Sequence, residues 1–174
     1  AVEIGARANE AIGPEFCLEH LLNSPGNFTA SKLAWVKANE PGIFSSVAHV
    51  MLPGDFISFR LTGTVTSTSS ALSEGVFWDF TKDALSEEIL QYFGFGKELF
   101  PVTREVFSEH GQLDSKVAAQ LSLRSGIPVS YKAGDQPNNA LSLGVTEPGE
   151  VAATAGTSGV IYAVSDQLTF DPLS

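Results

Sequence analysis

The chain has 174 residues, of which 43% are hydrophobic, and 20 acidic residues against 10 basic ones give it a formal net charge of −10. This acidic balance argues against binding to nucleic acid or to an anionic membrane surface, because both partners attract cationic faces. No apolar run approaches the roughly 20 residues that span a bilayer, and the N-terminal residues lack the basic and apolar segments of a signal peptide.

The first third of the chain is predicted to be mainly helical. Helical spacing of apolar residues, bounded by Pro and Gly, predicts helices over residues 2–13, 14–22, 29–40 and 52–63. Thr29 is expected to cap the third helix, and Gly63 to end the fourth in a left-handed conformation. The apolar run 47–51 is predicted as a strand because of its short length.

Cys17 is the lone cysteine and cannot form an internal disulfide, which favours a reducing, cytoplasmic location.

The middle of the chain mixes strands and helices. Residues 62–73 are rich in Ser and Thr, and the apolar residues around them favour two strands with a polar connection over a disordered linker. Helices are predicted over residues 83–93 and 114–126, and a strand over residues 102–107. Aromatic residues with apolar neighbours are expected in the core: Trp35, Phe56, Phe59, Phe77 and Trp78. This mixture predicts an α/β fold.

An acidic turn follows a predicted buried strand at residues 129–133 and precedes a predicted helix. In an open α/β sheet, a carboxylate at the carboxyl end of a strand lies where substrates bind. Asp135 in this turn is therefore a candidate catalytic residue. Capping of the following helix is the alternative, which the spacing by itself favours, and the two roles can coexist.

A β-hairpin is predicted near the C-terminus, where the apolar runs 151–155 and 160–164 flank the tetrad Gly156-Thr157-Ser158-Gly159. Glycines let backbone N–H groups approach an anion, and the hydroxyl groups add donors, so the tetrad could form a phosphate-binding nest. An ordinary hairpin turn explains the same residues and is favoured when the tetrad is considered alone.

Four blocks in this order resemble the FGGY carbohydrate kinase family, with its xylulose kinases the most similar members. They are residues 28–36, residues 52–56 with 60–63, the turn at Asp135, and residues 155–160 with 163–165. The resemblance covers nearly all of the chain and implies an actin-like ATPase (ribonuclease H-like) fold. The family's N-terminal phosphate loop and C-terminal adenosine-binding glycines have no counterpart here.

We therefore expect a fragment of a longer protein, in agreement with a start that lacks methionine. The resemblance implies that residues 1–145 are the C-terminal part of the first, sugar-binding domain. Residues 146–174 would be the opening β-hairpin of the second, nucleotide-binding domain. The fragment by itself is expected to be inactive.

The resemblance also implies an activity, namely ATP-dependent phosphorylation of a sugar hydroxyl, with a ketopentose such as D-xylulose as the expected substrate. Asp135 would be the general base, Asp135 and Gln136 would contact the sugar, and the tetrad would bind the phosphates of ATP. Mg²⁺ would accompany the nucleotide, held mainly by phosphates and water, and no protein metal site is predicted. The implied partners are the sugar and ATP, with a homodimer as an option.

Three departures from the family pattern leave the sugar open. Gln136 stands where xylulose kinases usually have Asn, and Thr68 and Ala71 stand where relatives commonly have Asp. The alternatives are a kinase for another sugar, polyol or sugar acid, a phosphatase or nucleotide hydrolase on the same fold, and a non-catalytic ligand-binding or interaction module.

Overall fold

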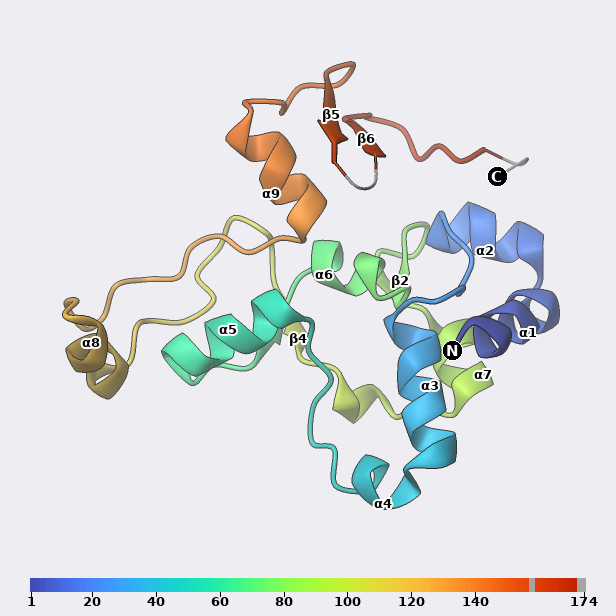
Figure 1. Ribbon diagram of the computed structural model, residues 1–174, viewed down its shortest axis with the longest axis horizontal. Helices are drawn as coiled ribbons and strands as arrows, with labels where there is room; N and C mark the ends of the chain where they lie inside the picture. The colour runs from blue at the N-terminus through green and yellow to red at the C-terminus, as the bar shows by residue number, and fades with distance from the viewer. Residues whose placement is uncertain (157–158, 172–174) are drawn as a thin grey trace.

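A computed structural model of the chain describes residues 1–156 and 159–171. The helices of this part are α1 (Val2–Ile12), α2 (Pro14–Leu21), α3 (Thr29–Asn39), α4 (Pro41–Phe44), α5 (Pro53–Thr62), α6 (Ser69–Glu74), α7 (Glu87–Phe93), α8 (Ser115–Leu121) and α9 (Asp135–Ser142), with a 3₁₀ turn at Lys97–Leu99. Figure 1 shows α1, α2, α3 and α7 gathered at one end and α8 at the other.

The strands among the described residues form three separate pairs. Strand β1 (Thr66–Ser67) is parallel to β4 (Val102–Thr103), β2 (Trp78–Asp79) is antiparallel to β3 (Ala84–Leu85), and β5 (Val151–Ala155) is antiparallel to β6 (Gly159–Ala163). The last pair is the predicted hairpin, in which Ala155 lies opposite Gly159. The α/β prediction is therefore confirmed.

Helix ends follow local signals at most of the predicted positions. Gly63 ends α5 with a φ of +73°, as predicted. Asp114 caps α8 by accepting hydrogen bonds from the Lys116 N–H at 2.9 Å and the Val117 N–H at 3.2 Å. The cap predicted at Thr29 is wrong, because Thr29 is already the first helical residue and the residue before it has no side-chain acceptor.

The Ser/Thr-rich segment differs from the prediction, because its polar connection is the helix α6. Thr68 accepts a hydrogen bond from the Ala71 N–H at 3.2 Å and so starts this helix. Helix α7 begins at Glu87 rather than at residue 83, because residues 84–85 pair with β2. Ser86 then caps α7 through the Ile89 N–H at 3.3 Å.

Two predicted strands are wrong or shorter than expected. Residues 47–51 form no strand, and their long-range backbone contact is a hydrogen bond from the Val50 N–H to the Leu99 carbonyl at 2.8 Å. Of residues 102–107, only Val102 and Thr103 belong to a strand. An apolar run becomes a strand only where a partner backbone lies along it, which periodicity does not reveal.

The core lies among α2, α3, α6, β2 and α7. Phe77 is fully buried at its centre, and its ring contacts that of Phe100 edge-on at a centroid distance of 4.8 Å. Trp78 is also buried, as predicted, whereas Trp35 and Phe56 are 44% and 47% exposed. Both lie on helices that bury only one face, so apolar neighbours in sequence do not place them inside.

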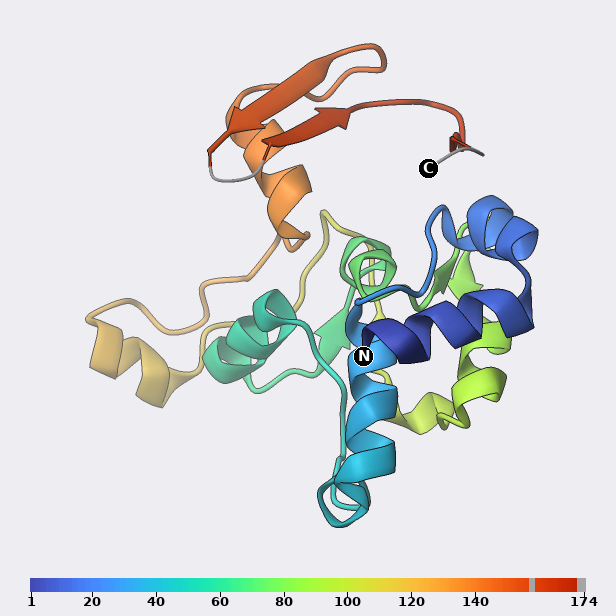
Figure 2. The same cartoon turned by 45° about the vertical axis from the view of Figure 1, so that its right-hand side comes forward.

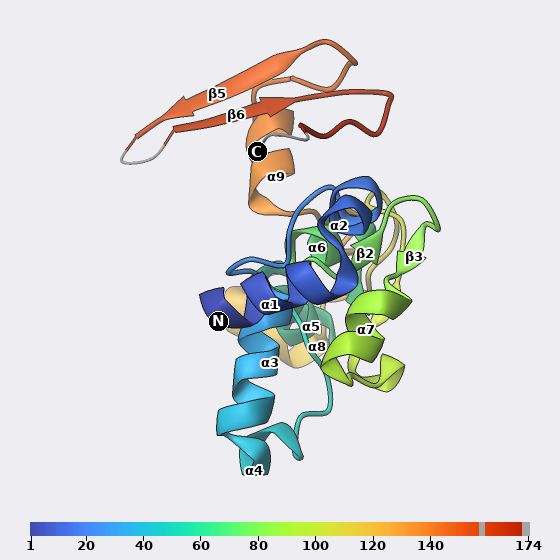
Figure 3. The same cartoon turned by 90° about the vertical axis from the view of Figure 1, so that its right-hand side faces the viewer.

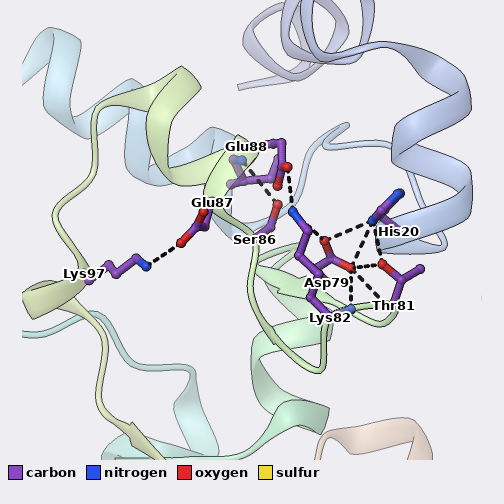
Figure 4. A network of polar contacts seen from close by, with 9 residues as sticks. His20, Asp79, Thr81, Lys82, Ser86, Glu87, Glu88 and Lys97 are labelled. Atoms are coloured by element: carbon purple, nitrogen blue, oxygen red, sulfur yellow. Dashed lines mark hydrogen bonds and ion pairs between the residues drawn. The ribbon is translucent and has the colours of Figure 1, made fainter.

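A buried carboxylate joins α2 to the turn between β2 and β3 (Figure 4). The Asp79 side chain has no exposed surface, and it accepts hydrogen bonds from the Thr81 N–H at 2.9 Å and the Lys82 N–H at 3.1 Å. His20 Nδ1 lies 3.0 Å from the other carboxylate oxygen. Lys82 extends the network to Glu88 on α7 at 2.7 Å.

Helix α9 and the β5–β6 hairpin stand apart from the helical part of the molecule (Figures 2 and 3). The two strands pack against α9. Beyond β6 the chain returns towards α2, where Phe170 lines a cavity together with Leu18. Among the described residues, none of the helices is both long and apolar enough to cross a membrane.

Candidate functional site

Asp135 is the first residue of α9, and its side chain is exposed. The residue that caps this helix is Gly134, which makes no side-chain cap hydrogen bond. The capping alternative for Asp135 is therefore wrong. A carboxylate in the first turn of a helix is stabilised by the helix dipole, and here it keeps its oxygens available to a ligand.

The segment that leads to Asp135 is not the predicted strand. Residues 129–133 are not part of a sheet, but they hydrogen-bond to a neighbouring segment: the Val129 N–H donates to the Gly111 carbonyl at 2.9 Å and the Lys132 N–H to the Val106 carbonyl at 3.2 Å. The Gly134 N–H donates to Ser70 Oγ on α6 at 3.0 Å. Hydrogen bonds from two sides therefore fix the entry to α9.

A cleft of about 330 Å³ opens beside Asp135. The start of α5, helix α6, residues 132–135 and Asn138 line it. The cleft contains three acidic side chains, Asp55, Glu74 and Asp135, and one lysine, Lys132. Two of these groups, Asp55 and Lys132, are 2% and 6% exposed and form an ion pair at 2.9 Å in its floor.

Glu74 lies against the backbone that enters α9. A Cβ atom added at Gly134 would collide with its carboxyl group, which would have to move aside. Burial raises the pKa of Glu74, and the negative charge of Asp135 raises it further, while a hydrogen bond from the Asp135 N–H acts in the opposite direction. Its Oε1 atom is shielded from solvent and has no hydrogen-bond partner among the described residues.

Gln136 lines a second, larger cavity of about 620 Å³. This cavity has aromatic walls from Phe107, Tyr131 and Tyr162, with the rings of Phe107 and Tyr131 at a centroid distance of 4.8 Å. Glu74 lines both cavities, which are therefore neighbours on the two sides of the α9 N-terminus. The structure thus brings Asp135 and Gln136 to adjoining spaces rather than to one.

The predicted phosphate-binding tetrad lies at the end of the hairpin. Gly156 follows β5 and Gly159 begins β6, whereas Thr157 and Ser158 lie outside the described residues. The hairpin itself is confirmed, and its phosphate-binding role stays a prediction.

Sequence reasoning missed Asp55, Glu74 and Lys132 as parts of the site. One signal was present, because Lys132 falls in a run predicted to be buried, and a buried ammonium group requires a counter-charge. Nothing in the sequence showed that the counter-charge is Asp55. In the described part of the chain, no group of three or more His, Cys, Asp or Glu side chains could hold a metal ion.

Comparison with known proteins decides the family. Residues 17–142 match the N-terminal domain of the FGGY family of carbohydrate kinases. The chain belongs to this family. The prediction of an actin-like ATPase fold is therefore confirmed.

The similar proteins include several xylulose kinases. Those of Klebsiella pneumoniae and Escherichia coli K12 are each 33% identical over 153 residues, which cover 88% of this chain and 31% of the relative. The crystal structure of a xylulose kinase from Rhodospirillum rubrum superposes with a TM-score of 0.90 at 26% identity, and one from Brucella ovis with 0.88 at 31%. Each superposition covers 98% of this chain and 35% of the solved chain. The FGGY chain described here thus spans about a third of the length of these relatives.

Proposed function

We propose that a protein carrying this chain transfers the γ-phosphoryl group of ATP to a hydroxyl group of a ketopentose such as D-xylulose. The observation that carries the proposal is the position of Asp135, which is exposed beside a cleft at the start of α9 and does not cap this helix. The chain also belongs to a family of carbohydrate kinases. Its similarity to xylulose kinases supports xylulose as the sugar.

Asp135 is the general base in this proposal. A sugar hydroxyl within hydrogen-bond reach of the carboxylate loses its proton to it as the oxygen attacks the phosphorus atom. Gln136 holds the sugar from the neighbouring cavity, where its amide can donate and accept hydrogen bonds. Burial and the charge of Asp135 raise the pKa of Glu74, so this carboxyl group takes up a proton more readily than an isolated glutamate does.

The tetrad Gly156-Thr157-Ser158-Gly159 is proposed to bind the ATP phosphates through backbone N–H groups. Mg²⁺ enters with the nucleotide and supplies charge neutralisation on its phosphates. The described residues offer it no cluster of protein ligands, so phosphate and water oxygens would hold it.

We also propose the division into a sugar-binding part, residues 1–145, and the opening hairpin of a nucleotide-binding part, residues 146–174. The family match that ends at residue 142 supports it, as does the change from α9 to the hairpin after that residue. The proposal places the protein in the cytoplasm, in line with its lone thiol, and a homodimer is the assembly to test by light scattering.

Sugar-dependent ADP release by the complete enzyme tests the proposal. Asp135→Asn should lower kcat by about 10²- to 10⁴-fold, because it removes the proton acceptor but keeps the shape of the side chain. Asp114→Asn is the matched control, since it makes the same charge change at the start of α8 and Asn also caps helices. Asp135→Asn activity within a few-fold of wild type would show that Asp135 is not the base.

A panel of D-xylulose, D-ribulose, glycerol and gluconate addresses the sugar. The highest kcat/KM is expected with D-xylulose. If another compound gave a higher value, the ketopentose assignment would be replaced while the kinase assignment would stand.

A further inference from the structure

Lys132 is buried, and its ammonium group contacts other parts of the protein although the residue lines the cleft. Its ammonium group lies 2.9 Å from Asp55 Oδ1, 2.6 Å from the Thr66 carbonyl oxygen and 3.1 Å from Thr66 Oγ1. The ammonium group donates hydrogen bonds to the two Thr66 oxygens, and its contact with Asp55 Oδ1 is an ion pair without an aligned hydrogen bond. The side chain is also 6% exposed. Its role is therefore to hold the protein rather than to bind a substrate.

The anchored residue lies three positions before Asp135, at the entry to α9. This entry has no strand to support it, and its backbone is held by separate hydrogen bonds to Val106 and Ser70. The Lys132 side chain adds a third attachment, to α5 through Asp55 and to β1 through Thr66. Three attachments in different directions leave the turn little freedom to move.

The acidic partner is itself fixed from both sides. Asp55 lies in the first turn of α5 and is 2% exposed. Its Oδ2 atom accepts a hydrogen bond from Ser67 Oγ on β1 at 2.7 Å. Because Asp55 is held by Ser67 and Lys132 by Thr66, the ion pair joins α5, β1 and the α9 entry into one rigid unit under the cleft.

We propose that the Asp55–Lys132 ion pair is a positioning element that fixes the α9 entry and thereby the direction of the Asp135 carboxylate. Its catalytic meaning rests on the proposed function, because Asp135 is the base only if the protein is a sugar kinase. Lys132 and Asp55 are positioning residues and do not contact the sugar.

The test uses the complete enzyme with Lys132→Met and with the double variant Asp55→Leu/Lys132→Met. Lys116→Met, an exposed lysine on α8, is the matched control. Removing one partner leaves a buried charge and can unfold the protein, whereas apolar replacement of both often preserves stability. The double variant therefore separates positioning from folding.

Measurements of two kinds are made. Kinetics of sugar-dependent ADP release give kcat and the KM for ATP, and measurements without substrate give the melting temperature and the amide hydrogen exchange of residues 133–142. The double variant should keep a melting temperature near wild type, lose about 100-fold in kcat and keep its KM for ATP, because small displacements of a catalytic group carry such costs. Amide exchange over residues 133–142 should be at least about tenfold faster, because fewer contacts hold the segment. The control variant should match wild type in both.

Three results would overturn the proposal: wild-type kcat in a folded double variant, unchanged exchange over residues 133–142, or loss of the whole fold in both variants. The last result would make the pair a general folding requirement. If wild-type enzyme released no ADP with any sugar, the proposed function would fail, and the exchange measurement would still decide whether the pair fixes the α9 entry.

Discussion

The buried carboxylate of Asp79 offers a quantitative test of the fold. In Asp79→Asn, the amide oxygen can still accept from Thr81 and Lys82, but the new NH₂ group faces His20 Nδ1, which lies 3.0 Å from Oδ2. The charge-assisted contact with His20 is therefore lost. The ion pair with Lys82, at 3.6 Å and partly exposed, adds little.

The expected loss of unfolding free energy is about 2 kcal/mol, the usual contribution of a hydrogen bond to a charged group. For a chain of 174 residues, this corresponds to a melting temperature lower by about 4–8 °C. Asp83→Asn is the matched control, since Asp83 is exposed on the same turn and has a positive φ that Asn tolerates.

The effect should depend on pH. Burial by itself raises the pKa of Asp79, but the hydrogen bonds from Thr81, His20 and Lys82 outweigh it and lower the pKa. Because the folded pKa lies below the unfolded one, this stability is fully present above the unfolded value of about 4 and is lost as the pH falls through the folded value. The difference between wild type and Asp79→Asn should therefore shrink in acid.

Urea titrations followed by circular dichroism at pH 7 and at low pH would measure this difference. If Asp79→Asn destabilised the chain no more than Asp83→Asn at pH 7, the network of Figure 4 would contribute nothing measurable. A difference of equal size at both pH values would refute the ionic origin of the effect.

Three further predictions concern single positions. Burial raises the pKa of the Cys17 thiol to about 11, so at pH 8 a thiol reagent should modify the native protein at least about 100-fold more slowly than the urea-unfolded protein, and equal rates would contradict its burial. Gly63→Ala should lower the free energy of unfolding by about 1 kcal/mol in urea titrations, because alanine is strained at a φ of +73°. The added Cβ would meet no other atom, so a steric clash does not contribute. An unchanged value would show that the left-handed end of α5 is unstrained. Gly134→Ala should push the Glu74 carboxyl out of place and lower kcat, and Glu74→Ala in the same chain should restore part of it. No rescue would mean that this contact is not the cause.

Signals within a few residues of one another account for most of what could be predicted. The Pro and Gly signals of α1, α2 and α5, the Asp114 cap and the β5–β6 hairpin depend on φ preferences and on side chains bonding to nearby backbone. The position of Asp135 at a turn into a helix also follows from such signals. The sequence does not show that Asp135 lies in the first turn rather than at the cap, because Asp is suited to both positions.

The remaining features depend on partners that are distant in sequence. Residues 47–51 and 129–133 have the composition of strands, but neither has a neighbouring strand along its length. The sequence shows that Lys132 lies in an apolar run. It does not show that Asp55 and Thr66 contact this lysine, because the contact forms only when α5, β1 and the α9 entry pack together. The sequence by itself determined the family, most helix ends and the candidate base Asp135. Only the tertiary structure decided what surrounds Asp135, because burial and ion pairing arise from packing rather than from the order of residues.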